Sequence, residues 1–300
     1  MRVTVTGGKG FLGRHVVAQL IERGHEVTAP SSKDYDLRSG VEAGDMLLDS
    51  KPDAVVHLAA RVGGIGDNVS APGTFLYENA MMGLQLMDSA RRLGVSKFLT
   101  VGTACMYPED APVPTTETSL WTGPPAKDTA PYAQAKTIVL EQGQAYAEQY
   151  DFNAVFVIPT NLYGPGDHTS HVLPQIVAKF MEAIDVDDDV LLWGSGSATR
   201  DFLYVEDAAA GIVAALENYN DPAPVNLGTG QETPIYALAS AIAWELGFQG
   251  RIHWDPLRPE GVMRRALNSS RAYQQFGWRY TTSLRQGLPQ YLNWIAKENT

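Results

Sequence analysis

The sequence contains little cysteine and no long hydrophobic run. Cys105 is the single cysteine among 300 residues, so the chain cannot form an internal disulfide, which suits a reducing compartment. No apolar run approaches the roughly 20 residues that a membrane-spanning helix needs. The first residues, MRVTVTGG, lack the apolar core of a secretion signal. We therefore expect a cytoplasmic protein without a membrane anchor.

Positive charge is also scarce. Lys and Arg number 23 against 34 Asp and Glu, which gives a formal net charge of −11. This balance argues against general binding to nucleic acid or to acidic membranes, although it allows a local basic pocket for an anionic ligand. The four aspartates between residues 185 and 189 are typical of a solvated turn rather than a metal site, and we expect no bound metal.

Short β-branched runs alternate with helical patterns through the first half of the chain. A strand at 2–6 leads into a helix at 11–24 that a glycine ends. The run DAVVHLAA (53–60) is apolar on both faces, as expected of a strand buried between helices. This alternation predicts an α/β fold with a doubly wound parallel sheet. The other elements expected here are strands at 25–29, 97–102 and 153–159 and helices at 72–93 and 131–150.

The pattern changes after Pro159, and this change predicts a second domain. A turn-rich stretch at 161–171 is followed by a helix at 205–218 and a buried strand at 224–228. We expect residues 1–160 plus 201–230 to form a Rossmann domain. The segments 161–200 and 231–300 would form a smaller α/β domain for the substrate, with helices and one strand (251–254) after residue 231.

A glycine motif follows the first expected strand. In TGGKGFLG, the glycines Gly7, Gly10 and Gly13 stand as GxxGxxG between that strand and a helix. Glycine lets the backbone turn tightly and approach a pyrophosphate, whose charge meets the helix N-terminus. With a strand before it and a helix after it, the motif predicts dinucleotide binding.

The residues after the second strand bear on the choice between NAD and NADP. The place where an NAD site usually has an acid reads Ala29, Pro30, Ser31. Lys9 and Lys33 offer amines that suit a 2′-phosphate, which favours NADP(H), although both could be solvated surface groups. Asp36 comes later in the loop, and we include it among the residues expected to bind the cofactor.

A tyrosine and a lysine share one face of the expected helix at 131–150. Tyr132 and Lys136 stand four residues apart in PYAQAK. A tyrosine hydroxyl can give a proton to an alkoxide as a hydride arrives, and a nearby ammonium is expected to lower its pKa and to hold a ribose hydroxyl. Thr103, after the fourth strand, could polarise the same substrate oxygen or could simply bond to backbone.

Together these motifs resemble the extended short-chain dehydrogenases/reductases. Further segments are similar to the GDP-L-fucose synthase branch of that family: AARVGGIG (59–66), GTACMYP (102–108), PTNLYGP (159–165), SHVLP (170–174) and WGSGSATRDFLYVED (193–207). The resemblance implies NADPH-dependent 3,5-epimerisation and 4-keto reduction of a nucleotide-linked 4-keto-6-deoxyhexose. The favoured substrate is GDP-4-keto-6-deoxymannose. The open alternative is a related epimerase or 4-ketoreductase acting on another sugar.

The resemblance assigns the epimerisation to Cys105 and His171. A 4-keto group acidifies the protons at C3 and C5, and inversion needs a base and an acid that titrate near neutrality, as thiols and imidazoles do. Cys105 could otherwise be a small buried hydrophobe. Spacing alone does not separate His171 from His168, and the motif selects His171.

The resemblance also implies a substrate-binding set and a homodimer. The dimer would pair the helices at 72–93 and 131–150, since Met81, Met82, Leu84 and Met87 give the first helix more apolar faces than one sheet covers. Three residues depart from the family pattern: Thr103 replaces a serine, Lys9 an arginine and Arg61 a lysine. The expected substrate-binding residues are Arg61, Asn161, Lys179, Trp193, Arg200 and Arg265.

Overall fold

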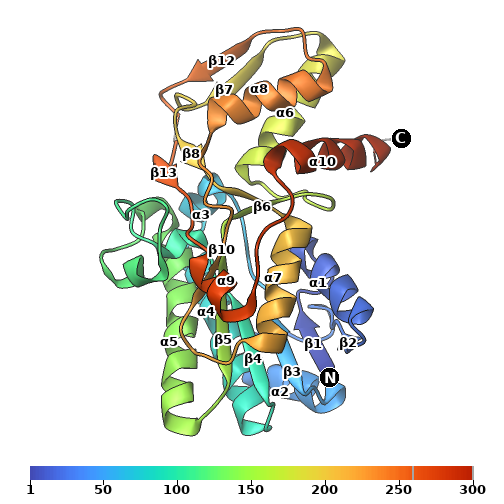
Figure 1. Ribbon diagram of the computed structural model, residues 1–300, viewed down its shortest axis with the longest axis vertical. Helices are drawn as coiled ribbons and strands as arrows, with labels where there is room; N and C mark the ends of the chain where they lie inside the picture. Colours follow the sequence, from blue (N-terminus) through green and yellow to red (C-terminus); the bar gives the residue numbers. More distant parts are fainter. Residues whose placement is uncertain (259, 299–300) are drawn as a thin grey trace.

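A parallel sheet of six strands forms the centre of the computed structural model, which describes residues 1–258 and 260–298 (Figure 1). The strand order is β10-β5-β4-β3-β1-β2, and every neighbouring pair is parallel. The chain leaves β1 toward β2 on one side and later returns to β3 on the other side. The switch point therefore lies between β1 and β3, where ligands of open α/β sheets bind. The strands are β1 (Arg2–Thr6), β2 (Glu26–Thr28), β3 (Ala54–His57), β4 (Lys97–Val101), β5 (Ala154–Pro159) and β10 (Val225–Leu227).

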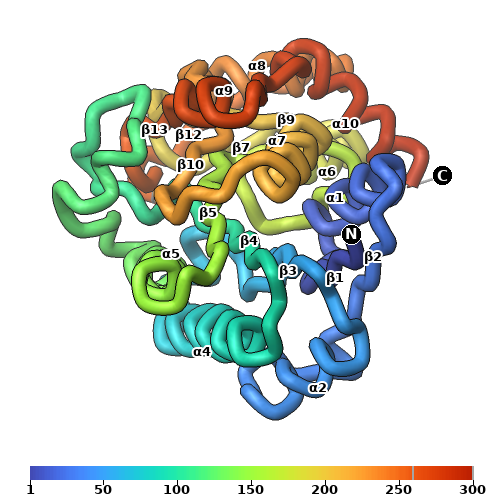
Figure 2. The backbone as a smooth tube through the Cα atoms, turned by 60° about the horizontal axis from the view of Figure 1, so that its bottom comes forward, coloured from blue at the N-terminus to red at the C-terminus, as the bar shows by residue number. Residues whose placement is uncertain are grey.

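Helices cover both faces of this sheet, which confirms the doubly wound fold. The helices α2, α4 and α5 pack together on one face, and α1 packs beside α7 on the other (Figure 2). Successive residues of β3 alternate between the two apolar cores: Val56 packs toward α1 and α7, and Val55 packs toward α2 and α4. The helices are α1 (Phe11–Glu22), α2 (Gly40–Ser50), α4 (Pro72–Arg92), α5 (Ala130–Tyr150) and α7 (Val205–Asn218).

The expected strand at 53–60 ends earlier than its apolar run. His57 pairs with Thr6, the last residue of β1, and Leu58 still donates its N–H to the Thr6 carbonyl. Beyond that point Gly7, at φ +69°, turns the neighbouring strand away. Residues 58–60 therefore lose β1 as a pairing partner and enter the loop above the sheet.

The remaining elements form a smaller body beyond the carboxyl ends of the sheet (Figure 1). Its own apolar core includes Phe180, Leu238 and Leu292. Its helices are α6 (Val172–Val186), α8 (Ile235–Leu246) and α10 (Leu284–Glu298), and its strands are β6 (Asn161–Tyr163), β7 (Val190–Trp193), β8 (Thr199–Arg200), β9 (Phe202–Tyr204), β11 (Thr233–Pro234), β12 (Ile252–Asp255) and β13 (Arg264–Arg265). The short helices α3 (Ile65–Ser70) and α9 (Ser270–Phe276) contribute no residue to this core. Short 3₁₀ turns lie between β4 and α5: η1 (Ala104–Met106), η2 (Glu117–Trp121) and η3 (Lys127–Thr129).

Two features of this body differ from the sequence-based expectation. Three strands, rather than one, lie after residue 231, because β11 and β13 each add two residues to the edges of β8. The α9 segment also packs away from the smaller body: Ala272 and Trp278 join the core beside α7. The domain division at residues 160, 200 and 230 stays a prediction.

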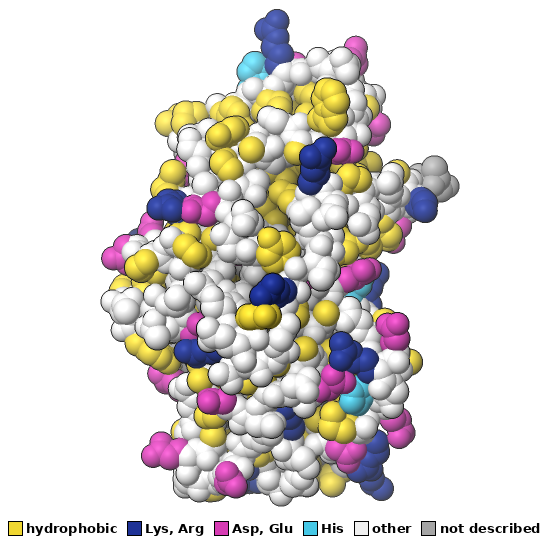
Figure 3. Space-filling view, viewed as in Figure 1, with side chains coloured by type: hydrophobic (Ala, Val, Ile, Leu, Met, Phe, Trp, Pro, Cys, Tyr) yellow, Lys and Arg dark blue, Asp and Glu magenta, His cyan; other side chains and the backbone are white. Residues whose placement is uncertain are grey.

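The charges on the surface and the character of the helices are consistent with the low content of Lys and Arg and with the lack of a long hydrophobic run. On the face shown in Figure 3, Lys and Arg side chains stand singly among acidic and apolar ones. Among the residues that the structure describes, no helix has the length and apolar character to cross a membrane.

Candidate active site

A cavity of about 1620 Å³ lies between the sheet and the smaller body. That volume exceeds the roughly 300–1,000 Å³ of an ordinary small-molecule pocket, so two ligands could share it. Every residue expected at the site lines the cavity except Lys33. Within the described part of the chain, no group of three or more His, Cys, Asp or Glu side chains could hold a metal ion.

The glycine motif forms a tight cradle at the switch point. Gly7 has φ +69°, and a Cβ there would lie 2.7 Å from the Ala59 N atom. The Gly10 N–H donates to the Gly7 carbonyl at 2.9 Å, and a Cβ on Gly13 would collide with that same carbonyl. Gly10 is the N-cap of α1 and has no side chain that could bond to the first amides of the helix. These amides are therefore available to bind an anion. This cradle fits the pyrophosphate of a dinucleotide.

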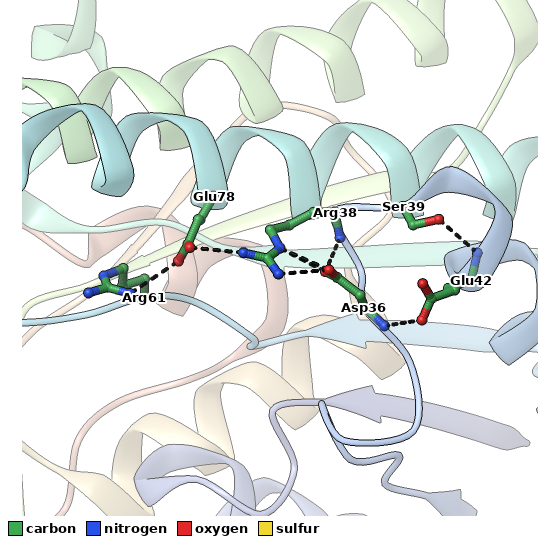
Figure 4. A network of polar contacts seen from close by, with 6 residues as sticks. All are labelled: Asp36, Arg38, Ser39, Glu42, Arg61 and Glu78. Atoms are coloured by element: carbon green, nitrogen blue, oxygen red, sulfur yellow. Dashed lines mark hydrogen bonds and ion pairs between the residues drawn. The ribbon is translucent and has the colours of Figure 1, made fainter.

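A chain of ion pairs borders the cavity beyond β2 (Figure 4). Arg38 donates to both carboxylate oxygens of Asp36 and to Glu78 on α4, whose other oxygen lies 3.4 Å from the Arg61 guanidinium. The Arg38 hydrogen bonds lower the pKa of Asp36. The sequence alone did not predict Arg38 or Glu78 at the site, because the residues of this network come from three separate segments of the chain.

The two lysines expected at the 2′-phosphate occupy different places. Lys9 lies in the glycine loop and lines the cavity. Lys33 is exposed in the loop after β2 and is not one of the described residues that line the cavity. The structure therefore does not bring Lys33 to the site, and Arg38 is the second cation at that end.

Tyr132 and Lys136 point into the cavity from the start of α5. Lys136 is 4% exposed, and no acceptor among the described residues bonds to its ammonium. Burial lowers the pKa of Lys136 to about 8. An ammonium with no protein acceptor among the described residues fits a residue that binds ribose hydroxyls.

The expected lowering of the Tyr132 pKa by Lys136 is wrong for the ligand-free protein. Burial raises the pKa of Tyr132, and the nearby Cys105 raises it further. Desolvation penalises the charged phenolate and is the larger cause of this shift. Tyr132 is thus held as the protonated phenol, the form that can give a proton.

Thr103 and Cys105 follow the end of β4. The Thr103 hydroxyl accepts from the Cys105 N–H at 3.2 Å and so caps the single turn η1. A bond to backbone was the alternative to a catalytic role for Thr103. This bond uses only a lone pair of the hydroxyl oxygen, so the hydroxyl proton can still be donated to a ligand. Cys105 is partly exposed within the turn and faces the cavity.

The structure separates the two candidate histidines. His171 caps the N-terminus of α6 and lines the cavity. His168 instead lies outside, where its Nε2 is 3.0 Å from Glu298 and its ring contacts Trp294 at an interplanar angle of 57°. Burial lowers the pKa of His171, although Asp167 and Asp67 partly oppose this. His171 is therefore a neutral base at pH 7.

A half-buried arginine, Arg200, and a buried one, Arg265, lie on the substrate side of the cavity. The Arg200 guanidinium donates to the carbonyls of Thr199 and Glu260, and Arg265 donates to those of Tyr107 and Pro108. Burial lowers the pKa of both, and the Cys105 thiol lies near enough to oppose that shift. These cations could meet a diphosphate.

Asp201 holds both arginine segments in place. It is fully buried, and its carboxylate accepts from the backbone N–H groups of Thr229, Gly230 and Leu267. Asn161, expected at the substrate, donates its amide to the Asp201 carbonyl at 3.0 Å while it lines the cavity.

An aromatic wall closes the far end of the cavity. Trp193 is half exposed, with the Lys179 ammonium 5.7 Å and the Arg258 guanidinium 5.4 Å from its ring. Burial and the nearby Arg258 lower the pKa of Lys179. Arg258 was missed by sequence reasoning, since a lone arginine in a loop carries no pattern.

Comparisons with known proteins agree with this geometry. Residues 3–228 match the NAD dependent epimerase/dehydratase family. The chain is 39% identical to a GDP-L-fucose synthase of Sinorhizobium fredii, over 96% of this chain and 93% of that protein. It is 33% identical to a GDP-L-colitose synthase of Yersinia pseudotuberculosis, over 99% of each. The crystal structure of a GDP-L-fucose synthetase from Naegleria fowleri bound to NADP superimposes with a TM-score of 0.88 at 27% identity, over 99% of this chain and 94% of that one. The chain belongs to the NAD dependent epimerase/dehydratase family.

Proposed function

We propose that the chain is a bifunctional enzyme that epimerises GDP-4-keto-6-deoxymannose at C3 and C5 and reduces it at C4 to GDP-L-fucose. The observation that carries the proposal is that Cys105 and His171 line the same cavity as Thr103, Tyr132 and Lys136. The first pair suits proton exchange beside a ketone, and the other three suit reduction of that ketone.

In the epimerisation, the 4-keto oxygen accepts a hydrogen bond from Thr103 or Tyr132, which acidifies C3 and C5. Cys105 and His171 remove and return protons at these carbons, one from each side. His171 is ready to accept a proton, because burial lowers its pKa. No hydride is needed in this half of the reaction.

In the reduction, NADPH supplies the hydride to C4 when it is bound. Tyr132 gives its proton to the oxygen at C4 as negative charge develops there, and Thr103 donates a second hydrogen bond to that oxygen. Lys136 would hold the ribose of the cofactor. Cys105 and His171 are different side chains from Tyr132 and Lys136, so each half can be removed by its own substitution, although Thr103 and Cys105 share one turn.

A preference for NADPH over NADH is supported by charges at the end of β2. Lys9 lines the cavity, and Arg38 donates to both oxygens of Asp36, which offsets the negative charge of that carboxylate. Lys9→Ala should raise the KM for NADPH more than that for NADH, and Lys33→Ala should change neither. An equal loss for both cofactors in Lys9→Ala would contradict the preference.

The test of the proposed function is product analysis in D2O. The protein is incubated with NADPH and GDP-4-keto-6-deoxymannose, and the product is examined by NMR. We expect GDP-L-fucose that carries deuterium at C3 and C5. The relative that makes GDP-L-colitose favours testing other nucleotide-linked 4-keto deoxy sugars in the same way. A product reduced at C4 without deuterium would overturn the epimerase half.

A further inference from the structure

The turn that carries His171 is bonded to the helix above the cavity. The Ser170 hydroxyl donates to Asp67 of α3 at 2.5 Å. The Gly64 N–H points to both partners, with the Ser170 oxygen and the Asp67 carboxylate each 2.9 Å away. A Cβ on Gly64 would lie 2.6 Å from the Ser170 carbonyl, so only glycine allows the two backbones to meet this closely.

The other end of the same turn is bonded to the smaller body. Asp167 accepts from the N–H and the hydroxyl of Thr169, and the Tyr291 hydroxyl donates to the Asp167 carbonyl at 2.9 Å. By contrast, the His171 imidazole has no hydrogen bond to any residue that the structure describes. Its place in the cavity is therefore set by the backbone on either side of it.

We propose that Ser170 and Asp67 are positioning residues for His171 and act on the epimerisation half of the reaction. This inference rests on the proposed function. Ser170 directly precedes His171, so its bond to Asp67 fixes where α6 begins and where the imidazole stands above the sugar. The reducing residues Tyr132 and Lys136 come from α5 and share no bond with this contact.

The consequence is a separation of two rates. Loss of the Ser170–Asp67 bond lets the imidazole move by a fraction of its own width, and a misplacement of about 1 Å can slow a reaction roughly 100-fold. Proton exchange at carbon should fall about 10- to 100-fold in Ser170→Ala. Hydride transfer should stay within about 2-fold of the unchanged protein, because its residues remain in place.

The experiment compares deuterium uptake at C3 and C5 with NADPH oxidation in four variants. Ser170→Ala and Asp67→Ala remove the bond from either side, and both should lose exchange selectively. Ser170→Thr keeps the hydroxyl and should restore exchange. Ser70→Ala is the matched control: Ser70 is an exposed serine on α3 that bonds only to the Asp67 backbone carbonyl, and its loss should change neither rate.

The outcomes are distinguishable. If the unchanged protein takes up no deuterium, the proposed function fails. If that protein exchanges and Ser170→Ala exchanges equally fast, the positioning role is wrong. If Ser170→Ala loses exchange and hydride transfer together, or if Ser170→Thr does not recover exchange, the contact serves stability alone and the proposal is also wrong.

Discussion

Burial sets the proton states of the groups at the centre of the cavity. It lowers the pKa of Lys136 to about 8, raises that of Tyr132 and lowers that of His171. In each case the neutral form gains, because desolvation penalises charge. The ligand-free protein thus holds a phenol that can donate and an imidazole that can accept.

The lowered pKa of His171 predicts an unusual acid limb for exchange. A base works only when unprotonated, and the ordinary histidine pKa is 6.5. Deuterium uptake at C3 and C5 should therefore stay level as the pH falls through 6.5 and should decline only below it. Asp167 and Asp67 face the imidazole and oppose the shift, but burial outweighs them. A decline centred at or above pH 6.5 in the unchanged protein would contradict this assignment.

The buried Lys136 predicts a gain in stability when it is removed. Its pKa is about 8 when folded and 10.5 in the ordinary state, so the folded protein loses this proton first as the pH rises. The cost of burial is full below pH 8 and vanishes above pH 10.5. Lys136→Met should raise the free energy of unfolding at pH 7 by about 1–3 kcal/mol and abolish hydride transfer.

Urea unfolding of the ligand-free protein measures this effect, and the gain should shrink between pH 8 and pH 10.5. Lys97→Met is the comparison, because burial also lowers the pKa of Lys97 to about 8 but Lys97 donates to Ala215 and Asn220. That variant should gain less, since it leaves acceptors unpaired. A loss of stability in Lys136→Met at pH 7 would show that the ammonium is satisfied after all.

At the scale of elements, the hydrophobic pattern of the sequence predicted the long helices and the strands of the central sheet. The runs at 2–6, 97–102 and 153–159 became strands of the central sheet because their apolar faces fill both cores. The strands β11 and β13 could not be predicted, since two residues carry no periodicity. These two short strands form because each pairs with one edge of β8.

In the candidate site, too, residues in local motifs were predicted and their partners from distant segments were not. Motifs located Gly7, Tyr132 and Cys105 because each follows a strand or begins a helix at a readable spacing. The partners that fix the site were not predicted: Arg38, Glu78 and Asp201 act through residues that are distant in the sequence. Lys33 was misplaced, because charge alone does not say which way a loop residue points.

Asp201 predicts a coupling between stability and substrate binding. Asp201→Asn removes the charge that backbone amides of two segments share, and each charged hydrogen bond contributes about 1.5–3 kcal/mol. We expect a lower free energy of unfolding and a higher KM for the nucleotide sugar, because β8 and β13 carry Arg200 and Arg265. Asp221→Asn is the control: Asp221 is exposed and accepts from Ala223. Unchanged KM in Asp201→Asn would separate this carboxylate from the site.

At the scale of the whole molecule, we propose a homodimer through α4 and α5, which pack side by side. One part of the original argument is wrong: Met87 is 1% exposed and belongs to the core of the protomer. The exposed large apolar side chains of the two helices are instead Leu76, Tyr77, Ile138 and Tyr150.

Light scattering tests this assembly. The protein should have twice the mass of one chain at micromolar concentration, and Ile138→Glu should shift it toward the monomer. Ile21→Glu, on the exposed side of α1 at the opposite face of the sheet, should leave the mass unchanged. A monomer in the unchanged protein would rule out the proposed pairing.

One cavity is proposed to carry two chemistries on separate residues, and the central claim is that they can be uncoupled. The most direct measurement follows deuterium uptake at C3 and C5 together with NADPH oxidation in Cys105→Ser and Tyr132→Phe. Cys105→Ser should lose epimerisation by roughly 10²–10⁴-fold and still oxidise NADPH, while Tyr132→Phe should stop reduction and keep taking up deuterium, since Thr103 still holds the ketone. If Cys105→Ser exchanges and epimerises at the rate of the unchanged protein, the single cysteine is only a packing residue and the account is wrong.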